Sequence, residues 1–233
     1  MGAIRHIEKL RTLTMKRLLI VSAGAFGREV LSWALDVPAA QRDWEVAGFL
    51  DNRPSALDGF NCPFSIMGDP LNFELSENDC LICAIGDPAT KLQYCNQLKA
   101  RGGQFISLIH PTAVIGLNCR LGEGCILCPY VVVTTNVVLG SFVTLNCHTT
   151  VGHDVVIDDG CTLSCHSDVT GWASLGEGVL LGSHASVLPK AVVGDYALVG
   201  AGSVVLRKVL PHTTVMGVPA KQVYGFKDSS HNF

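Results

Sequence analysis

The sequence carries little charge and lacks the long apolar runs of membrane proteins. Only 16% of its 233 residues are charged and the formal net charge is −3, so no general attraction to nucleic acid or to an anionic membrane is expected. No apolar stretch approaches the roughly 18–20 residues of a membrane span. The first residues carry charges throughout and have no apolar core of the signal-peptide type. We therefore expect no nucleic-acid or membrane partner.

The ten cysteines do not form the framework of a small secreted protein, because the chain is too long and their spacings are irregular. Reduced thiols in a cytoplasmic protein fit better, so a cytoplasmic location is expected.

Strands and helices alternate in the first hundred residues. "RLLIVSA" (17–23), "WEVAGFLD" (44–51) and "DCLICAIGD" (79–87) have the pattern of buried strands, and helical patterns follow the first and the third. Such alternation predicts a parallel sheet. We expect a Rossmann-like domain over residues 15–107, preceded by an N-terminal extension, residues 1–14.

A six-residue repeat takes over after residue 107. Steps of six from Ile109 to Val205 land on Ile, Leu or Val seventeen times in a row. A small or β-branched residue stands four positions after each, and Gly often follows the aliphatic residue directly. Such an internal repeat determines a fold by itself.

The repeat predicts a parallel β-helix over residues 108–216, followed by a C-terminal tail, residues 217–233. Three six-residue sides make one coil of a triangular prism, with the aliphatic residue pointing inward and glycine in the turns. Cys119, Cys125 and Cys161 fall in the inward slot for small residues, where a free cysteine packs like any small apolar side chain. The "CLIC" segment (80–83) is interpreted as part of a core strand.

The chain resembles bacterial nucleotide-sugar acetyltransferases of the sialic-acid O-acetyltransferase and bacillosamine/perosamine N-acetyltransferase type. The resemblance covers about residues 16–224 and is carried by "SAGAFGREV", "FLDN", "AIGDPATK", "LIHPTAVIG", "LNCHTTVGHDVVI" and "GVPAK". It implies that the β-helix is left-handed and binds acetyl-CoA, without a metal. It also implies a homotrimer whose active sites lie between subunits, and a nucleotide-sugar substrate.

The resemblance assigns the catalytic roles to "VGHD". His153 would be the general base, and Asp154 would orient its ring and stabilise the imidazolium. The chemistry suits these residues, since histidine has an unperturbed pKa of about 6.5 and can accept a proton from the attacking acceptor near neutral pH. The acceptor would be an amino or hydroxyl group of the sugar, with a 4-amino sugar preferred and O-acetylation of the sialic-acid type as the alternative.

The resemblance also implies two sets of binding residues. We expect acetyl-CoA to contact Thr162, Gly171, Gly182, Gly200, Ala201, Gly202, Pro219 and Lys221. We expect the nucleotide sugar to contact Gly24, Gly27, Asp51, Asn52, Gly86, Asp87 and Asn146. For Asp51 and Asp87, loop capping is the competing interpretation. Thr162 stands where relatives often carry a second histidine that helps to hold the acetyl group, so the site departs from the family pattern there.

A second group of histidines follows the coil length. His148, His166 and His184 are eighteen residues apart and must stack along one prism edge, with Tyr130 one coil before them. They line either a subunit interface, with or without an ion, or a plain surface. Two further functions stay open. One is a γ-carbonic-anhydrase-like zinc enzyme, in which His148 and His153 would be two of the zinc ligands. His110 is close to the position of the third ligand but out of phase with the repeat. The other is a non-catalytic sugar-nucleotide-binding subunit.

Overall fold

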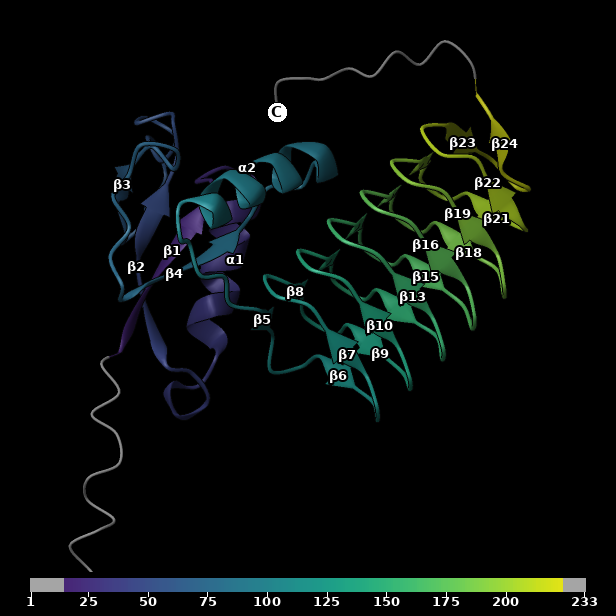
Figure 1. Ribbon diagram of the computed structural model, residues 1–233, viewed down its shortest axis with the longest axis horizontal. Helices are drawn as coiled ribbons and strands as arrows, with labels where there is room; N and C mark the ends of the chain where they lie inside the picture. Colours follow the sequence, from purple (N-terminus) through teal and green to yellow (C-terminus); the bar gives the residue numbers. More distant parts are fainter. Residues whose placement is uncertain (1–14, 224–233) are drawn as a thin grey trace, which may run out of the picture.

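The computed structural model describes residues 15–223. The predicted N-terminal extension and residues 224–233 of the predicted tail lie outside the described residues. An α/β domain comes first and a long triangular β-helix follows it (Figure 1). Within residues 15–223, neither α-helix is long and apolar enough to cross a membrane.

The N-terminal sheet is entirely parallel. Its strands lie in the order β3-β2-β1-β4, with the bounds β1 Lys16–Val21, β2 Trp44–Leu50, β3 Ile66–Gly68 and β4 Asp79–Cys83. The apolar runs of β1 and β4 are buried on both sheet faces, as expected of a parallel sheet. Strand β3 was not predicted, because three residues are too few to produce a pattern.

Two helices and a short 3-10 turn complete this domain. Helix α1 (Ala25–Asp36) follows β1 and buries the predicted apolar stripe, which includes Val30 and Leu31. Helix α2 (Pro88–Ala100) follows β4 and starts at Asp87, whose carboxylate accepts a hydrogen bond from the Thr90 N–H. The 3-10 turn spans Ala39–Gln41.

The β-helix has three parallel faces made of very short strands. The β5 face contains β5 (Leu108–Ile109), β8 (Ile126–Leu127), β11 (Thr144–Leu145), β14 (Thr162–Leu163), β17 (Leu180–Leu181), β20 (Leu198–Val199), β23 (Thr214–Met216) and the antiparallel β24 (Lys221–Gln222). The β6 face contains β6 (Val114–Ile115), β9 (Val132–Val133), β12 (Thr150–Val151), β15 (Asp168–Val169), β18 (Ser186–Val187) and β21 (Val204–Val205). The β7 face contains β7 (Arg120–Leu121), β10 (Val138–Leu139), β13 (Val156–Ile157), β16 (Ser174–Leu175), β19 (Val192–Val193) and β22 (Lys208–Val209).

The register confirms the predicted coil of eighteen residues. Val138 pairs with Val156 and Thr150 pairs with Asp168, so each strand lies on the strand three places earlier. The aliphatic residues of the repeat fill the prism: Leu145, Val151 and Ile157 are fully buried. The last coil is shorter, because Val192 pairs with Lys208 across only sixteen residues.

The inward slot for small residues holds its cysteines as predicted. Cys125 and Cys161 are fully buried, and their thiols lie 3.2 and 3.0 Å from the carbonyl oxygens of Gly140 and Gly176. Cys119 makes the corresponding contact with Thr134 but is only half-buried. The "CLIC" cysteines, Cys80 and Cys83, lie in the core strand β4.

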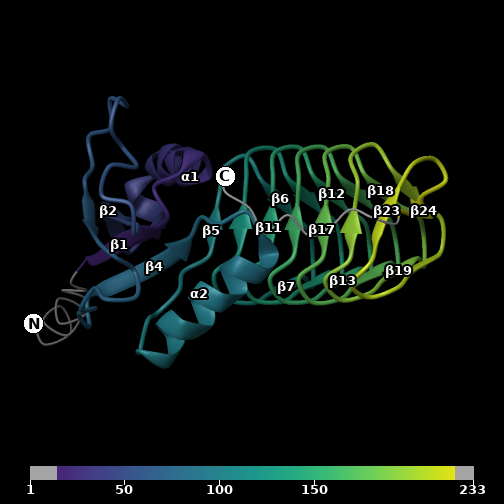
Figure 2. The ribbon, with the colours of Figure 1, turned by 90° about the horizontal axis from the view of Figure 1, so that it is seen from above.

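Helix α2 lies along the first coils of the prism and joins the two parts of the chain (Figure 2). Its Lys91 is 1% exposed, and the ammonium donates to Thr144 Oγ1 (3.1 Å), the Cys161 carbonyl (3.1 Å) and Thr162 Oγ1 (2.9 Å). A side chain at Gly160 would collide with Leu92 of the same helix. The β5 face is therefore covered by α2 near its start.

Candidate active site

His153 lies on the edge where the β6 face turns into the β7 face, between β12 and β13. Its Nδ1 is 2.8 Å from Asp154 Oδ2, and the two side chains are 48% and 34% exposed. Asp154 can adopt this position because its backbone is left-handed (φ 59°), which turns its carboxylate back toward the preceding ring. A carboxylate on Nδ1 favours the tautomer with the proton on Nδ1 and leaves Nε2 to accept another proton.

The next coil provides the surroundings of the imidazole ring. Trp172 meets the His153 ring edge to face, with centroids 4.4 Å apart and an interplanar angle of 89°. A Cβ placed on Gly171 would lie 2.6 Å from both Cε1 and Nε2 of His153. Only glycine therefore allows this ring position, and the backbone of Gly171 lies directly beside the proton-accepting nitrogen.

The residues predicted to bind acetyl-CoA divide between two edges of the β6 face. Gly171 shares the β6/β7 edge with His153, as its eighteen-residue spacing predicts. Thr162 lies within β14 of the β5 face. The remaining residues in the regular coils follow strands of that face and therefore lie on the β5/β6 edge: Gly182, Gly200, Ala201 and Gly202. Asn146, predicted to contact the sugar, also lies on that edge, where its amide donates to the Leu163 carbonyl. One chain alone does not bring these two sets together.

The packing gives two of these glycines a structural reason, while their assignment to acetyl-CoA stays a prediction. Gly200 is buried, and a side chain there would run into Met216, so its role is to let the next coil pack. Gly182 is half-buried, and a Cβ placed on it would lie 2.5 Å from the amide nitrogen of Ala201. Ala201 and Gly202 are exposed and stay available for binding.

Thr162 does not lie beside His153. Nine residues are half a coil, so Thr162 falls on the β5 face, which is opposite the His153 edge. It is 4% exposed, and its hydroxyl accepts a hydrogen bond from Lys91. In this chain the Thr162 hydroxyl belongs to the contact between α2 and the prism, and the assignment of Thr162 to acetyl-CoA stays a prediction.

The N-terminal sheet provides a second candidate binding region. In the order β3-β2-β1-β4 the chain reverses its direction of winding between β1 and β4, and ligands of such folds bind at the carboxyl ends of these strands. Gly24, at the N-terminus of α1, and Gly86, between β4 and α2, lie at these ends. Gly86 has open space around it, and Asn52 after β2 is exposed.

Gly27 contributes to the packing of α1 against the end of β1. It is buried, and a Cβ there would lie 2.0 Å from the Ser22 carbonyl oxygen. Glycine at this position lets α1 approach the end of β1, and the substrate contact of Gly27 stays a prediction.

Asp51 and Asp87 both make capping interactions. Asp51 is 6% exposed and accepts hydrogen bonds from the Ala23 N–H and from the backbone and guanidinium of Arg53. Burial raises the pKa of Asp51, but these hydrogen bonds more than offset burial and the net pKa is lowered. Asp87 accepts from both the N–H and the hydroxyl of Thr90 at the start of α2. The competing interpretation, loop capping, describes what both carboxylates do in this structure.

Comparisons with known proteins agree with this two-part architecture. Residues 17–98 match the model of the PglD N-terminal domain, and residues 173–207 match the bacterial transferase hexapeptide model of six repeats. The acetyltransferase domain of PglB from Neisseria gonorrhoeae has 27% sequence identity and a TM-score of 0.82; the match covers 89% of this chain and 100% of that one. PerB from Caulobacter crescentus, solved with CoA and GDP-perosamine, has 28% identity and a TM-score of 0.79, over 90% and 98% of the two chains. Among curated protein sequences, none is significantly similar.

The chain has the architecture of the nucleotide-sugar acetyltransferases. Both the fold class and the family resemblance predicted from the sequence are thereby confirmed, including the hexapeptide β-helix of left-handed type. WeeI from Acinetobacter baumannii, at 24% identity and a TM-score of 0.67 over 89% of this chain and 100% of that one, supports the fold alone.

The predicted histidine column is present on the β5/β6 edge of this acetyltransferase-like prism. The rings of Tyr130, His148, His166 and His184 stack with successive centroid distances of 5.0, 4.8 and 4.7 Å. All four residues are exposed and have left-handed backbones with φ of 61°. Within residues 15–223, no group of three or more His, Cys, Asp or Glu side chains is arranged to hold a metal ion.

His110 has a partner of its own. Its Nδ1 lies 2.8 Å from Thr112 Oγ1, and its Nε2 lies 3.3 Å from the Asp36 carboxylate at the end of α1. The ring therefore faces the N-terminal domain rather than the histidines of the later coils.

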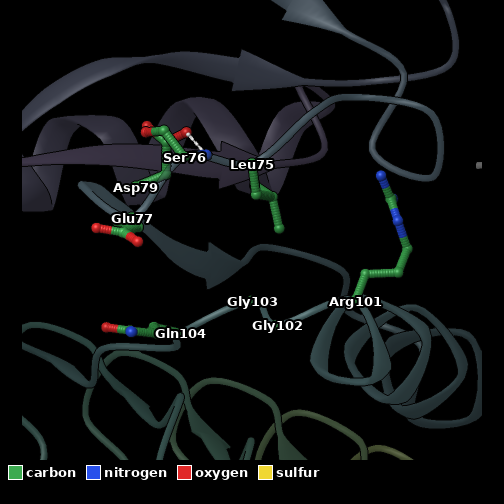
Figure 3. A pocket seen from close by; sticks show the side chains of 8 residues that line it. All are labelled: Leu75, Ser76, Glu77, Asp79, Arg101, Gly102, Gly103 and Gln104. Atoms are coloured by element: carbon green, nitrogen blue, oxygen red, sulfur yellow. Dashed lines mark hydrogen bonds between the residues drawn. The ribbon is translucent and has the colours of Figure 1, made fainter.

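Two hollows lie away from His153. One, of about 510 Å³, lies between the loop before β4 and the end of α2, and Asp79, Glu77 and Arg101 are among its lining residues (Figure 3). The other, of about 550 Å³, lies at the last coil. Pro219 and Lys221, both predicted to contact acetyl-CoA, line it together with Arg207 and Lys208.

Proposed function

We propose that this protein transfers the acetyl group of acetyl-CoA to a nucleotide-linked sugar. The observation that carries the proposal is the His153–Asp154 pair on an exposed prism edge, beside a glycine that leaves Nε2 uncovered. The similar structures from N. gonorrhoeae and C. crescentus, at 27% and 28% identity, are acetyltransferases solved with acetyl-CoA or with CoA and a nucleotide sugar.

His153 acts as the general base. The acceptor nitrogen or oxygen attacks the thioester carbonyl while Nε2 takes its proton, and the carboxylate of Asp154 stabilises the imidazolium through Nδ1–H. The tetrahedral intermediate then collapses, the carbon–sulfur bond breaks, and the imidazolium returns the proton to the CoA thiolate. The N–H of Gly171 is the candidate donor to the oxyanion, because its backbone lies beside Nε2.

The acceptor we favour is the amino group of a 4-amino sugar linked to a nucleoside diphosphate. The similar C. crescentus protein is a perosamine N-acetyltransferase, at 26% identity, and a histidine can take the one proton that a neutral amine loses near neutral pH. We assign the nucleotide to the domain of residues 15–107, at the ends of β1 and β4 near Gly24 and Gly86. The acetyl-CoA site belongs to residues 108–216, extended by Pro219 and Lys221 of the segment that begins at residue 217.

The site is completed by another copy of the chain in a homotrimer. The positions of the predicted site residues and the exposed apolar side chains both support this arrangement. His153 lies on a convex edge, and the other coil residues assigned to acetyl-CoA lie on the opposite edge of the β6 face. A cyclic assembly through that face brings the β5/β6 edge of one copy to the β6/β7 edge of the next. Exposed apolar side chains lie on this face and its edges, including Val114 (57% exposed), Leu117 (76%) and Trp172 (56%).

We place the reaction in the cytoplasm, in the synthesis of surface polysaccharide or another glycan. Nucleotide-activated sugars are the building blocks of such polymers, and the ten free cysteines are compatible with a reducing compartment.

The test is a CoA-release screen with purified protein and acetyl-CoA. Acceptors are UDP-, dTDP- and GDP-linked 4-amino sugars, with free sialic acid as the hydroxyl acceptor. We expect release with one amino sugar, and loss of release by at least about a hundredfold in His153→Ala, because general base catalysis is worth roughly 10²–10⁴-fold. Light scattering of both proteins should give about three times the chain mass of 24.8 kDa. Near wild-type turnover in His153→Ala would show that the assigned base is wrong.

A further inference from the structure

A hydrogen-bonded column of three polar side chains runs along the β6/β7 edge and ends at the active-site carboxylate. Asn118 Nδ2 donates to Asn136 Oδ1 at 3.2 Å, and Asn136 Nδ2 donates to Asp154 Oδ1 at 3.2 Å. Asp154 in turn contacts His153 Nδ1 through its other oxygen, Oδ2. The two oxygens of Asp154 therefore have separate partners, one in the preceding coil and one in the imidazole ring.

The charge of Asp154 determines the direction of these hydrogen bonds. An ionised carboxylate can only accept, so Asn136 must present its NH₂ group to Oδ1. The carbonyl oxygen of Asn136 then faces Asn118, which must present its own NH₂ group. All the donors in the column thus point toward Asp154, and reversing either amide would place two acceptors against each other.

The backbone keeps the column in place. Asn118, Asn136 and Asp154 all have left-handed backbones, with φ of 60°, 58° and 59°. Each coil is tied to the preceding one at this edge, because Asn136 N–H donates to the Leu117 carbonyl and Asp154 N–H donates to the Thr135 carbonyl. Asparagine is well tolerated in this conformation, but so is glycine, which would leave the carboxylate without a donor.

We propose that Asn136 is a positioning residue for the His153–Asp154 pair. By holding Oδ1, it prevents the half-exposed carboxylate from rotating away, so that Oδ2 stays on Nδ1 and Nε2 stays unprotonated and ready to accept. This inference rests on the proposed function for its catalytic consequence, whereas the orientation of the carboxylate and the tautomer of His153 can be measured without any substrate.

A purely structural role at the turn would have different consequences. If Asn136 served only to occupy a left-handed position, glycine would replace it without a change in the imidazole. If it positions Asp154, Asn136→Gly keeps the turn but releases the carboxylate, so part of the His153 population changes to the Nε2–H tautomer. Asn136→Asp keeps the size of the side chain but replaces the donor with a second negative charge, which repels Asp154.

The experiment combines two measurements on Asn136→Gly, Asn136→Asp, Asn118→Gly and a control, His212→Gly. His212 is a left-handed position (φ 55°) on another edge, so it reports the effect of glycine in such a turn by itself. The first measurement is the ¹⁵N chemical shift of both His153 ring nitrogens in histidine-labelled protein, above the pH at which the ring titrates. The chain has 8 histidines, and the spectrum of His153→Asn identifies the His153 signals. The second is steady-state CoA release.

We expect wild-type His153 to be mainly Nδ1–H and the two Asn136 variants to show a mixture of tautomers. Their kcat should fall about fivefold to tenfold, the change that corresponds to the loss of one ordinary hydrogen bond, with KM for acetyl-CoA within about twofold. Asn118→Gly should have a smaller effect, and His212→Gly should leave the His153 signals unchanged.

An unchanged tautomer in Asn136→Gly would overturn the inference, even if kcat falls, because the role would then be structural. A larger tautomer change at Asn118 than at Asn136 would also overturn it. If wild-type protein releases no CoA with any acceptor, the proposed function fails, while the tautomer measurement still decides the role of Asn136.

Discussion

Replacing Lys91 by methionine tests the buried contact that joins α2 to the β-helix. The ammonium donates three hydrogen bonds, to Thr144, Thr162 and the Cys161 carbonyl, which is the full number that it can make. Burial lowers the pKa of Lys91 from 10.5 to about 8, because removal from water disfavours the charged form. The wild-type protein therefore carries a cost for its buried charge at neutral pH, and the three hydrogen bonds offset only part of it.

The sign of the pH dependence follows from the two pKa values. Below pH 8 the lysine is protonated in both the folded and the unfolded chain, so the cost is constant. Between pH 8 and pH 10.5 only the unfolded chain keeps the proton, so the free energy of unfolding rises with pH. The slope is about 1.4 kcal/mol per pH unit, which amounts to about 3 kcal/mol over this interval. Lys91→Met lacks this contribution, because methionine does not titrate.

The assay is guanidinium unfolding of both proteins between pH 7 and pH 10, followed by tryptophan fluorescence. At pH 7 the two free energies of unfolding should differ by no more than about 2 kcal/mol, since the lost hydrogen bonds and the relieved charge burial act in opposite directions. The wild-type protein should gain about 2–3 kcal/mol over the variant by pH 10. Other groups titrate in both proteins, so only the difference between the two is interpreted. A difference that stays constant with pH would refute the reasoning, because Lys91 would then keep its proton in the folded protein.

Four further predictions concern single residues. Asp154→Asn should lower kcat/KM for CoA release by roughly a hundredfold, because an amide cannot stabilise the imidazolium, and it should leave the thermal midpoint unchanged. A decrease of less than about threefold would contradict the assignment of His153 and Asp154 as the catalytic pair. Gly171→Ala should displace the His153 ring, because the new Cβ would lie 2.6 Å from Nε2, and it should lower kcat by about a hundredfold. The control is Gly102→Ala, whose Cβ would have no other atom within 4 Å. Because the backbone of Gly102 is left-handed (φ +87°), this control should cost only about 1–2 kcal/mol of stability. Gly27→Ala should prevent α1 from packing on β1 and lower the thermal midpoint by more than about 10 °C, as expected from a loss of several kcal/mol. By contrast, Gly86→Ala, in open space, should keep its midpoint and weaken nucleotide-sugar binding measured by calorimetry.

Much of the fold follows from local patterns in the sequence. The six-residue repeat determines which side chains enter the prism, because the strand alternation and the turn leave one large and one small inward position on each side. The α/β part follows from apolar runs bounded by glycine and from an amphipathic stripe such as Val30, Leu31 and Ala34. Strand β3 was missed because Ile66–Gly68 is too short to carry a period.

The candidate site was predictable only where its members share a coil position. His153 and Asp154 are adjacent in the chain, and Gly171 follows one coil later, so their proximity is a matter of counting. The Asn118–Asn136 column has the same eighteen-residue spacing and could have been found in the same way from Asp154. The same counting places Thr162 half a coil away from His153 in its own chain, on the opposite side of the prism.

The sequence by itself determined the coil, its stacked columns and the imidazole–carboxylate pair, because each depends on chain neighbours or on a constant spacing of eighteen residues. Only the tertiary structure decided that Lys91 lies buried against Thr144 and Thr162 and that Asp51 accepts a hydrogen bond from the Ala23 N–H. These contacts join segments as far as 71 residues apart in the chain. No local period encodes how a helix from one domain packs on the face of another.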